Sequence, residues 1–569
     1  MSVLQPSPTL AHVTAYSVPS HPAPIDLRLD GNEGMCPPAD LLDALTEAGP
    51  EVMRRYPDSS ELQGLIAERL GVEPNRVLVT AGADDALDRA CRAMLAPGRQ
   101  MLLPSPSFEM LPRYAGLTGA KVVIVAWPPG KSFPIEAALK AITQSTALVC
   151  FVSPNNPTGA VARVEDMRRL SEAAPHALIL ADFAYSEFAD RDDTQTALSL
   201  PNVVVVRTFS KAWGLAGLRV GYAVGPLEVI AWMRAAGSPY SVSRPSLLLA
   251  VQALQRGDDA MRAFVERVRF EREELRRLFV SHGVESFPSQ ANFLLVRHAD
   301  ALWLRDSMAG MGIAIRAFPG RESLADCVRI TCPGEQEQFE RVCRSLSVVL
   351  APQALLLDLD GVLADISGSY RRAVFETAKT FGVALDPQEV VRAKAQGASN
   401  NDYELTYRLL TLRGVRVSLD EVTARYESLY AGEEGLWRNE RLLVDAQWLR
   451  RLAAKIPIGV VTGRLRIHAE RFLSAVGLLD CLGALVCMED APEKPSPEPL
   501  LLAMRRLGVQ RAWMIGDLVD DVRASRAAGV LPLAVVSPAD TPEVMAPALL
   551  RAGAARVLTR LEELERLLP

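Results

Sequence analysis

The sequence has no two cysteines spaced as CxxC among its eight, and its six histidines are scattered over 569 residues. These spacings suit neither a disulfide framework nor a zinc site. We therefore expect reduced thiols, as in a cytoplasmic protein. The histidines are expected to have structural or surface roles rather than to bind a metal.

Long apolar runs and an excess of positive charge are also missing. No run approaches the length of a membrane span, and residues 1–27 lack the basic start and apolar core of a signal peptide. The net charge of −6 gives no reason to expect a nucleic acid or an acidic membrane as partner. The 49% hydrophobic and 23% charged residues are typical of an ordinary globular protein.

Strand-like apolar runs alternate with amphipathic stretches, which predicts a parallel α/β fold. The predicted strands of the first series are 76–80, 121–127, 146–152, 177–182 and 202–209. A long charged helix at 257–280 leads into an α+β subdomain. Its predicted strands are 291–297, 312–318 and 326–332, and a helix at 334–350 closes it.

A second α/β series follows the short connection 351–354. Its predicted strands are 354–360, 458–463, 483–488, 512–517 and 533–537, and the stretch from about 366 to 450 is mainly helical. A chain of this length exceeds a single hydrophobic core. The sequence therefore predicts two complete α/β units joined head to tail.

The densest chemical signal of the first unit is "RTFSKAWGLAGLRVGY" at 207–222. Lys211 stands just beyond a buried-type strand, flanked by hydroxyl groups and followed by an arginine. A lysine that forms a Schiff base needs this rigid placement, with a phosphate anchor nearby. For Lys211 taken alone, a surface lysine after a strand would be the favoured interpretation.

Further motifs recur in order around it: "LDGNEG" (29–34), "RRYPD" (54–58), "VTAGADDALDRA" (79–90), "PSPSFEM" (104–110), "PNNPTG" (154–159), "DFAYSEF" (182–188), "ANFLLV" (291–296) and "VRITCPG" (328–334). Over residues 25–350 the chain resembles the fold-type-I pyridoxal-phosphate aminotransferases, and specifically the histidinol-phosphate aminotransferase family. The resemblance implies an aminotransferase at 1–350, with a large α/β domain at 46–234 and a small α+β domain at 1–45 and 235–350.

The resemblance also implies roles for particular residues. Lys211 would bind the cofactor aldehyde and move the substrate proton, Asp182 would pair with the pyridine nitrogen, and Phe108 would stack on the ring. The remaining cofactor contacts would come from Tyr185 and Asn156 at the ring hydroxyl and from Gly82, Ala83, Asp84, Thr208, Ser210 and Arg219 at the phosphate. Tyr56 would reach the phosphate of a neighbouring subunit, which implies a homodimer.

Two arginines bear on the substrate. Arg329 matches the anionic anchor of this fold, and Arg316 lies at the spacing of a phosphate clamp; paired guanidinium groups suit a phosphate. Arg316 by itself would also fit a surface salt bridge. Two departures from the family pattern are Phe183 after the aspartate and "GNEGMCPP" near the substrate.

The second unit opens with "DLDGVLAD", where Asp358 and Asp360 leave a strand on the same side. One carboxylate can attack phosphorus while the other acts as general acid and then base. Mg²⁺ is the natural cation for oxygen ligands and a phosphate.

The other residues of such a site follow in order along the chain. Thr462 would bind the phosphoryl oxygens, and Lys494 would offset the negative charge of the nucleophile and the transferring group. Asp517 would be a further metal ligand, and Asp521 would support the lysine or a metal-bound water. With these four motifs, 354 to about 540 resembles the haloacid-dehalogenase-like hydrolases. The resemblance implies a Rossmann-like hydrolase at 351–569, with its core at 354–364 and 451–569 and a helical cap at 365–450. Asp358, Asp360, Asp517 and Asp521 would form the metal site. Asn400, Asn401 and Asp402 would either cap a helix or contact substrate.

These expectations combine into a bifunctional enzyme. In histidine biosynthesis, transamination of imidazole acetol phosphate by glutamate precedes dephosphorylation of histidinol phosphate. Two alternatives stay open: a decarboxylase or aminotransferase of another phospho-amino acid joined to an unrelated phosphatase, and a non-catalytic regulatory second unit.

Overall fold

The computed structural model describes residues 4–10, 13–15 and 20–569. Residues 1–27, in which we expect no signal peptide, thus lie partly outside the described residues. By its packing the chain forms two compact units. The first contains 29–301 and 315–340 with the described residues before 16, and the second contains 20–28, 302–314 and 341–569.

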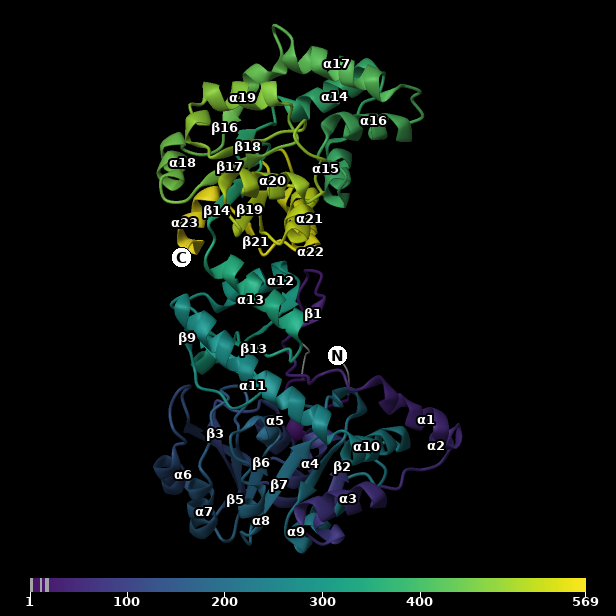
Figure 1. Cartoon of the computed structure of the whole chain (residues 1–569), viewed down its shortest axis with the longest axis vertical. Helices are drawn as coiled ribbons and strands as arrows, with labels where there is room; N and C mark the ends of the chain where they lie inside the picture. Colours follow the sequence, from purple (N-terminus) through teal and green to yellow (C-terminus); the bar gives the residue numbers. More distant parts are fainter. Residues whose placement is uncertain (1–3, 11–12, 16–19) are drawn as a thin grey trace. The chain divides into compact units, whose positions relative to one another are not determined.

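A seven-stranded sheet forms the centre of the first unit (Figure 1). In spatial order its strands are β2 (Val77–Thr80), β8 (Gly221–Val224), β7 (Val203–Thr208), β6 (Leu178–Asp182), β5 (Thr146–Val152), β3 (Gln100–Ser105) and β4 (Lys121–Ala126). All run parallel except β8, which is antiparallel to both its neighbours. The predicted parallel α/β architecture is confirmed, although β3 and β8 were not predicted.

The strand sequences are continuous apolar runs because helices cover both faces of this sheet. In β5, Leu148 packs with Ala86 of α4 (Gly82–Met94), whereas its neighbour Val149 packs with Met167 of α7 (Val164–Ala173). Successive side chains of a strand point to opposite faces, so both must be apolar.

A smaller sheet of the first unit has the order β12 (Arg316–Ala317), β13 (Cys327–Thr331), β10 (Phe293–Arg297) and β9 (Glu285–Ser286), all antiparallel. It comes after α11 (Asp258–Ser281), which lies within one residue of the predicted helix. The single strand predicted at 312–318 is wrong. Ile313–Ala314 (β11) instead pairs with Leu27–Arg28 (β1), and only β12 joins the sheet.

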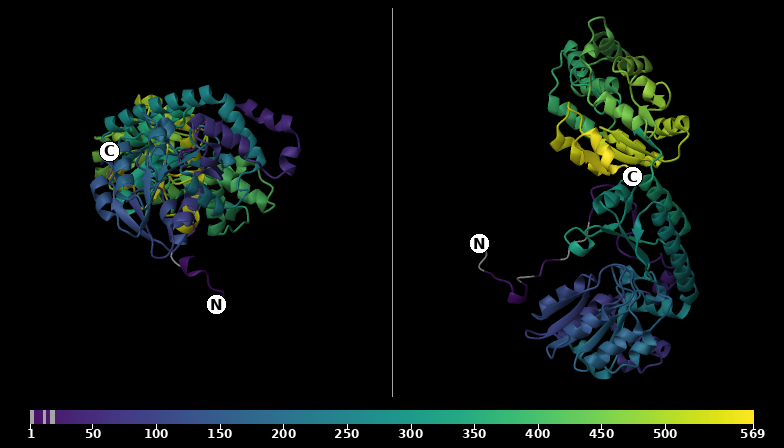
Figure 2. Two further views of the ribbon diagram at one scale, coloured as in Figure 1. Left: turned by 90° about the horizontal axis from the view of Figure 1, so that it is seen from below. Right: turned by 90° about the vertical axis from the view of Figure 1, so that its left-hand side faces the viewer.

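The second unit is built on a six-stranded parallel sheet (Figure 2). Its order is β18 (Ala484–Val486), β17 (Ile458–Val461), β14 (Ala354–Leu357), β19 (Ala512–Gly516), β20 (Leu531–Val535) and β21 (Arg556–Leu558). Leu500 and Ala503 of α20 (Glu498–Leu507) pack against Leu356 and Met514. The carboxyl ends of β14, β17 and β19 meet at one edge, and Asp358, Thr462 and Asp517 are the residues just beyond them.

The stretch predicted as helical contains α14 (Tyr370–Thr380), α15 (Pro387–Gln396), α16 (Asp402–Leu412) and α17 (Leu419–Ala431). Two short strands bracket it, because β15 (Ala364–Asp365) pairs antiparallel with β16 (Arg441–Leu442). After this strand pair, α18 (Ala446–Ala453) leads into β17 of the six-stranded sheet. Among the described residues, none of the helices has the length and apolar character of a membrane span.

Trp513 of β19 gives a test of this packing. Its side chain is fully buried, its indole N–H donates to the Val348 carbonyl (2.8 Å), and its ring meets that of Trp303 at 5.4 Å. Trp513→Ala should lower the free energy of unfolding of the second unit by about 3–5 kcal/mol. Urea denaturation measures this, with exposed Ile467→Ala as the matched control. Equal midpoints for the two variants would contradict this packing.

Candidate active sites

The carboxyl ends of the central strands of the first unit open onto a cavity of about 360 Å³. Twelve of the residues predicted to bind the cofactor or the substrate line it: Ala83, Asp84, Phe108, Asn156, Asp182, Tyr185, Thr208, Ser210, Lys211, Arg219, Arg316 and Arg329. The fold thus brings together residues that are far apart in the chain.

Lys211 lies in the loop after β7, with its ammonium 3.3 Å from the Gly31 carbonyl and 5.7 Å from the centre of the Tyr185 ring. Burial and the nearby charge of Arg329 lower the pKa of Lys211 to about 8. An amine with this pKa is partly neutral under physiological conditions, and the neutral form is the nucleophile.

Asp182 ends β6 and is buried, with one oxygen accepting the backbone N–H of Ala184 (3.1 Å). Burial is the main reason why its pKa is raised to about 6. A buried carboxylate of this kind calls for a cationic partner. A protonated ring nitrogen in the cavity would provide one.

A cradle for a phosphate lies at the amino end of α4. Arg219 reaches it from a left-handed backbone conformation (φ 51°), and its guanidinium donates to Asp84 (3.1 Å) and Ser210 (3.4 Å). The Thr208 hydroxyl donates to that of Ser210 at 2.9 Å. Gly82 has a left-handed backbone conformation (φ 76°) that favours glycine, and a Cβ there would lie 2.6 Å from the Arg219 guanidinium. Backbone N–H groups at this helix start suit an anion.

Three guanidinium groups line the substrate side of the cavity. Arg329 donates to Asn156 Oδ1 and to the Asp30 carbonyl, both at 2.6 Å, while no described residue accepts a hydrogen bond from its buried Nε. Arg316 pairs with Glu109 at 3.2 Å. Arg321, which sequence reasoning missed, donates to the Ser107 carbonyl at 3.0 Å. Its place in an irregular loop left no periodic signal.

Two predicted contacts take other partners here. Asn156 bonds Arg329, and the Tyr185 hydroxyl accepts from Asn32 at 3.0 Å. Asn32 belongs to the divergent "GNEG" segment and was not singled out as a site residue. Tyr56 does not line the cavity; it is 80% exposed and stacks on Tyr240 at 4.8 Å.

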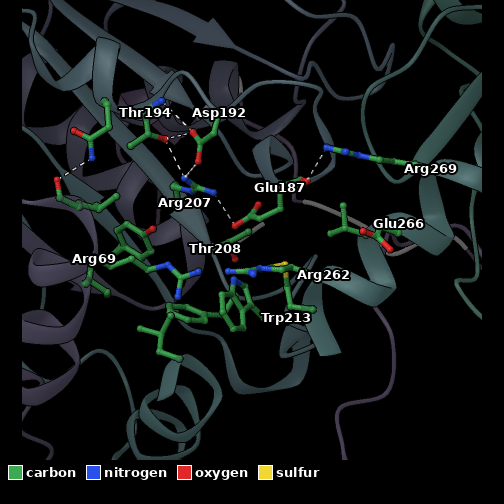
Figure 3. Close-up of a pocket in the computed structure, with 18 residues that line it drawn as sticks. Arg69, Glu187, Asp192, Thr194, Arg207, Thr208, Trp213, Arg262, Glu266 and Arg269 are labelled. Atoms are coloured by element: carbon green, nitrogen blue, oxygen red, sulfur yellow. Dashed lines mark hydrogen bonds and ion pairs between the residues drawn. The ribbon is translucent and has the colours of Figure 1, made fainter. Parts of the chain in front are cut away.

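Arg207, the residue before Thr208 in β7, belongs to a group of ion pairs beside a second cavity (Figure 3). The buried Arg207 donates to Asp192 (2.7 Å) and Thr194 (2.9 Å) and pairs with Glu187 (2.9 Å), at the edge of a second cavity of about 470 Å³. Burial opposes its charge, but Glu187 and Asp192 raise the pKa of Arg207. This ion-pair group fixes the end of β7 next to the lysine loop.

In the second unit, the Lys494 ammonium lies between Asp358 (2.9 Å) and Asp521 (2.5 Å), and it also donates to the Val461 carbonyl (3.2 Å). All three side chains are buried. Burial opposes the charge of Lys494, but the two carboxylates raise its pKa. Burial also raises the pKa of Asp358, which Lys494 counteracts. Thr462 is buried at the same sheet edge and accepts the backbone N–H of Arg464 (3.2 Å).

Carboxylate oxygens of Asp358, Asp517 and Asp521 lie within 4.8 Å of one another. Oδ1 of the buried Asp517 has no hydrogen-bond partner among the described residues, and such an orphaned oxygen suits a metal ligand. A Cβ on Gly361 (φ 72°) would lie 2.2 Å from Asp517, which explains the glycine of "DLDG". The carboxylate of Asp360, predicted with the metal site, is outside this group because it is bound to Arg464.

The loop before α16 lies against the same strand ends. Asp520 accepts the backbone N–H groups of Ala398 (3.0 Å) and Ser399 (2.8 Å), and Asn401 donates to Glu493 (3.0 Å). Asn401 also accepts from Tyr403 and Glu404, so the predicted helix cap is confirmed. Lys394, buried beside Asp402 (3.6 Å), was not predicted. Its charge opposes the rise in the pKa of Asp517.

Comparison with known families assigns both units. The family described as aminotransferase class I and II matches residues 27–346, and that described as haloacid dehalogenase-like hydrolase matches residues 352–529. A histidinol-phosphate aminotransferase of Paracoccus denitrificans is 32% identical over 58% of this chain and 90% of its own length. An aromatic amino acid aminotransferase of Nocardia farcinica is 34% identical over 60% of this chain and 97% of its own length.

Two further similarities concern different proteins. An imidazoleglycerol-phosphate dehydratase of Phytophthora nicotianae is 42% identical over 36% of this chain and 50% of its own length. The crystal structure of histidinol-phosphate aminotransferase from Sinorhizobium meliloti, in complex with pyridoxal 5'-phosphate, has a TM-score of 0.56 and 25% identity. That similarity covers 61% of this chain and 97% of the other.

Asp182 gives a test of the first cavity. Burial raises the pKa of Asp182 from 3.8 to about 6, so the folded protein binds this proton more tightly than the unfolded chain does. The stability that comes from this proton is complete below pH 3.8 and is lost as the pH rises through 6. At about 1.4 kcal/mol per pKa unit, Asp182→Asn should stabilise the ligand-free protein at about pH 8 by about 3 kcal/mol. The gain should vanish near pH 4.

Denaturant unfolding at the two pH values measures this difference. Exposed Glu172→Gln is the control and should change little at either pH. A destabilised Asp182→Asn protein at pH 8 would mean that the carboxylate already has a partner in the ligand-free fold.

Proposed function

The chain belongs to the aminotransferase class I and II family and carries a haloacid dehalogenase-like hydrolase domain, and from this premise we propose that it catalyses two consecutive steps. The first is transamination between imidazole acetol phosphate and glutamate. The second is hydrolysis of the histidinol phosphate that results. The observation that carries the proposal is the group of three arginines facing the lysine cavity, together with the lysine–carboxylate site of the second unit.

Pyridoxal phosphate is the cofactor of the aminotransferase, and when bound it stabilises negative charge on the substrate carbon. The residues present fit it. Arg219, Ser210, Thr208 and the amino end of α4 would hold its phosphate, and Asp182 would keep a proton on its ring nitrogen. Phe108 would cover one ring face, while Tyr185 and Asn156 would bond the ring hydroxyl.

Lys211 would perform the proton transfer. Its Nζ, lowered in pKa by burial and Arg329, can accept a proton from the substrate carbon and return it at another position. Arg329 and Arg316 would bind the anionic end of the substrate, so that the carbon lies near this nitrogen. The unpartnered Nε of Arg329 is available for this contact.

A phosphate is favoured as that anionic end. A single carboxylate needs one guanidinium fork, whereas a dianion can use several. Glu109 offsets the positive charge of Arg316. Arg321, which lines the same cavity, adds a further positive charge. The histidinol-phosphate aminotransferase similarity supports this substrate class. The similar aromatic amino acid aminotransferase favours a second candidate, an aromatic amino acid held by Arg329 alone.

In the second unit we assign Asp358 as nucleophile. Its Oδ attacks phosphorus, the ester P–O bond breaks, and Asp360 gives a proton to the departing oxygen. Asp360 then takes a proton from a water molecule, whose oxygen attacks phosphorus and frees the Asp358 carboxylate. Lys494 offsets the negative charge of these steps, and Thr462 would bond a phosphoryl oxygen.

Mg²⁺ would be held by Asp358 and Asp517, with Asp521 in support, and would neutralise charge on the phosphate. The orphaned Asp517 oxygen supports this assignment. The helical insertion 366–440 would act as the cap, since its loop at 398–401 is bonded to Asp520 and Glu493 beside the site. Caps exclude water and select the substrate.

Three further points complete the proposal. The similarity to the imidazoleglycerol-phosphate dehydratase covers 36% of this chain. The name of that protein contains an imidazole phosphate ester, which supports a place in histidine biosynthesis. Eight free cysteines support a reducing, cytoplasmic setting. Exposed Tyr56, with Leu42 and Met53 close to it in sequence, supports a homodimer in which Tyr56 serves the partner's cofactor.

Lys211→Ala should abolish amino transfer from histidinol phosphate to 2-oxoglutarate, a loss of at least about 10⁴-fold, because no other amine in the cavity can replace it. Glutamate formation measures the rate. Carbon dioxide released from phosphothreonine, with no glutamate formed from histidinol phosphate, would instead favour a decarboxylase. Faster turnover of phenylalanine than of histidinol phosphate would favour the aromatic candidate.

Asp358→Asn should abolish phosphate release from histidinol phosphate by at least about 10³-fold, because the amide is no nucleophile, while amino transfer stays unchanged. Chelation of Mg²⁺ should also abolish phosphate release, and added Mg²⁺ should restore it. Phosphate production measures both effects. A wild-type protein that is folded and supplied with Mg²⁺ but hydrolyses no phosphoester would favour a non-catalytic second unit.

A further inference from the structure

Arg464 is the most completely buried charged residue near the hydrolase site, with a side chain that is 0% exposed. It lies two residues after Thr462, in the turn beyond β17. Its Nε and Nη2 both donate to Oδ1 of Asp360, at 2.8 and 2.5 Å. One oxygen of the proposed acid–base residue thus receives two charged hydrogen bonds.

The other side of the guanidinium is tied to the insertion. Nη1 donates to Glu440 (3.0 Å), immediately before β16, and the guanidinium lies 4.6 Å from the ring centre of Tyr370, the first residue of α14. Glu440 is itself held by the Tyr430 hydroxyl at 2.8 Å. Arg464 therefore contacts the helical insertion both near its start, at Tyr370, and at its end, at Glu440.

This arrangement makes the two oxygens of Asp360 unequal. Oδ1 is occupied by Arg464, and no hydrogen bond from the described residues reaches Oδ2 in the structure. The Asp360 side chain is 25% exposed, in contrast to the fully buried arginine. A proton on this carboxyl group is therefore best placed on Oδ2, since Oδ1 already faces two N–H donors.

We propose that Arg464 is a positioning residue for hydrolysis, which fixes Asp360 so that Oδ2 gives its proton to the departing oxygen of the ester. Through Glu440 and Tyr370 it places that proton relative to the insertion. The inference rests on the proposed phosphatase activity. Arg464 is not among the residues to which we assign the phosphate and the metal.

The dependence on the leaving group distinguishes this role from a structural one. A nitrophenolate leaves without a proton, whereas an alkoxide needs one, so only the alkyl ester depends on a well-placed acid. The later water step is common to both esters, so the first step is measured by itself, as first-turnover release of the alcohol. Arg464→Met should slow this release by about 100-fold for histidinol phosphate and by less than about 3-fold for 4-nitrophenyl phosphate. Asp360→Asn and the double variant should be equally slow on histidinol phosphate, because both residues act through one proton.

Arg464→Lys keeps the charge but loses the two-nitrogen fork. If Arg464→Met unfolds the protein, Arg464→Lys replaces it in the experiment. We expect a smaller decrease in rate for this variant, and only with histidinol phosphate. Arg466→Met is the matched control, since Arg466 pairs with Glu470 and Asp490 and not with Asp360. It should leave the ratio of the two rates unchanged.

Equal losses on the two esters, or losses that multiply in the double variant, would overturn the role of Arg464. A wild-type protein that hydrolyses neither ester would instead overturn the proposed phosphatase function. The two failures are therefore distinguishable.

Discussion

Both sites depend on charge that is buried at the carboxyl ends of parallel strands. In the first unit, Asp182 is buried and Lys211 is half-buried, and neither forms an ion pair with another described residue. The pKa of each is shifted in the direction that favours its neutral form. In the second unit, Lys494 compensates Asp358 and Asp521 directly. Buried charges are costly unless they are paired. The first site is therefore incomplete without a charged ligand, and the second is held together by its own ion pairs.

The proposed chemistry explains this difference. A cofactor that brings a cationic ring nitrogen, an aldehyde and a phosphate would complete the interactions of Asp182, Lys211 and Arg219 together. A substrate phosphate would occupy the hydrolase site only during turnover. The buried Lys494 therefore needs carboxylates of the protein itself to compensate its charge at other times. The proposed function also accounts for the order of steps. The arginines would bind the phosphate of the first substrate, and hydrolysis would then remove the group by which that substrate was recognised.

The sequence was sufficient for the strand ends and for most of the residues that gather there. Continuous apolar runs marked β5 and β6 because both faces of the sheet are covered, and short motifs marked the functional side chains just beyond each strand. We did not predict the roles of Arg321, Lys394 and Arg464. Each lies in a loop or in the insertion, where no periodicity of the sequence indicates what surrounds a side chain. Asn401 could be predicted as a helix cap, since capping is local. The pairing of Arg464 with Asp360 spans 104 residues and could not be predicted from local sequence.

The central claim is that the two sites act in sequence on one phosphorylated substrate. The most direct measurement gives the protein, loaded with pyridoxal phosphate and Mg²⁺, imidazole acetol phosphate and glutamate, and monitors the imidazole products and free phosphate over time. The account predicts histidinol and phosphate in equal amounts, with histidinol phosphate as a transient. Histidinol phosphate that accumulates without phosphate release, or phosphate released before any amino transfer, would contradict it.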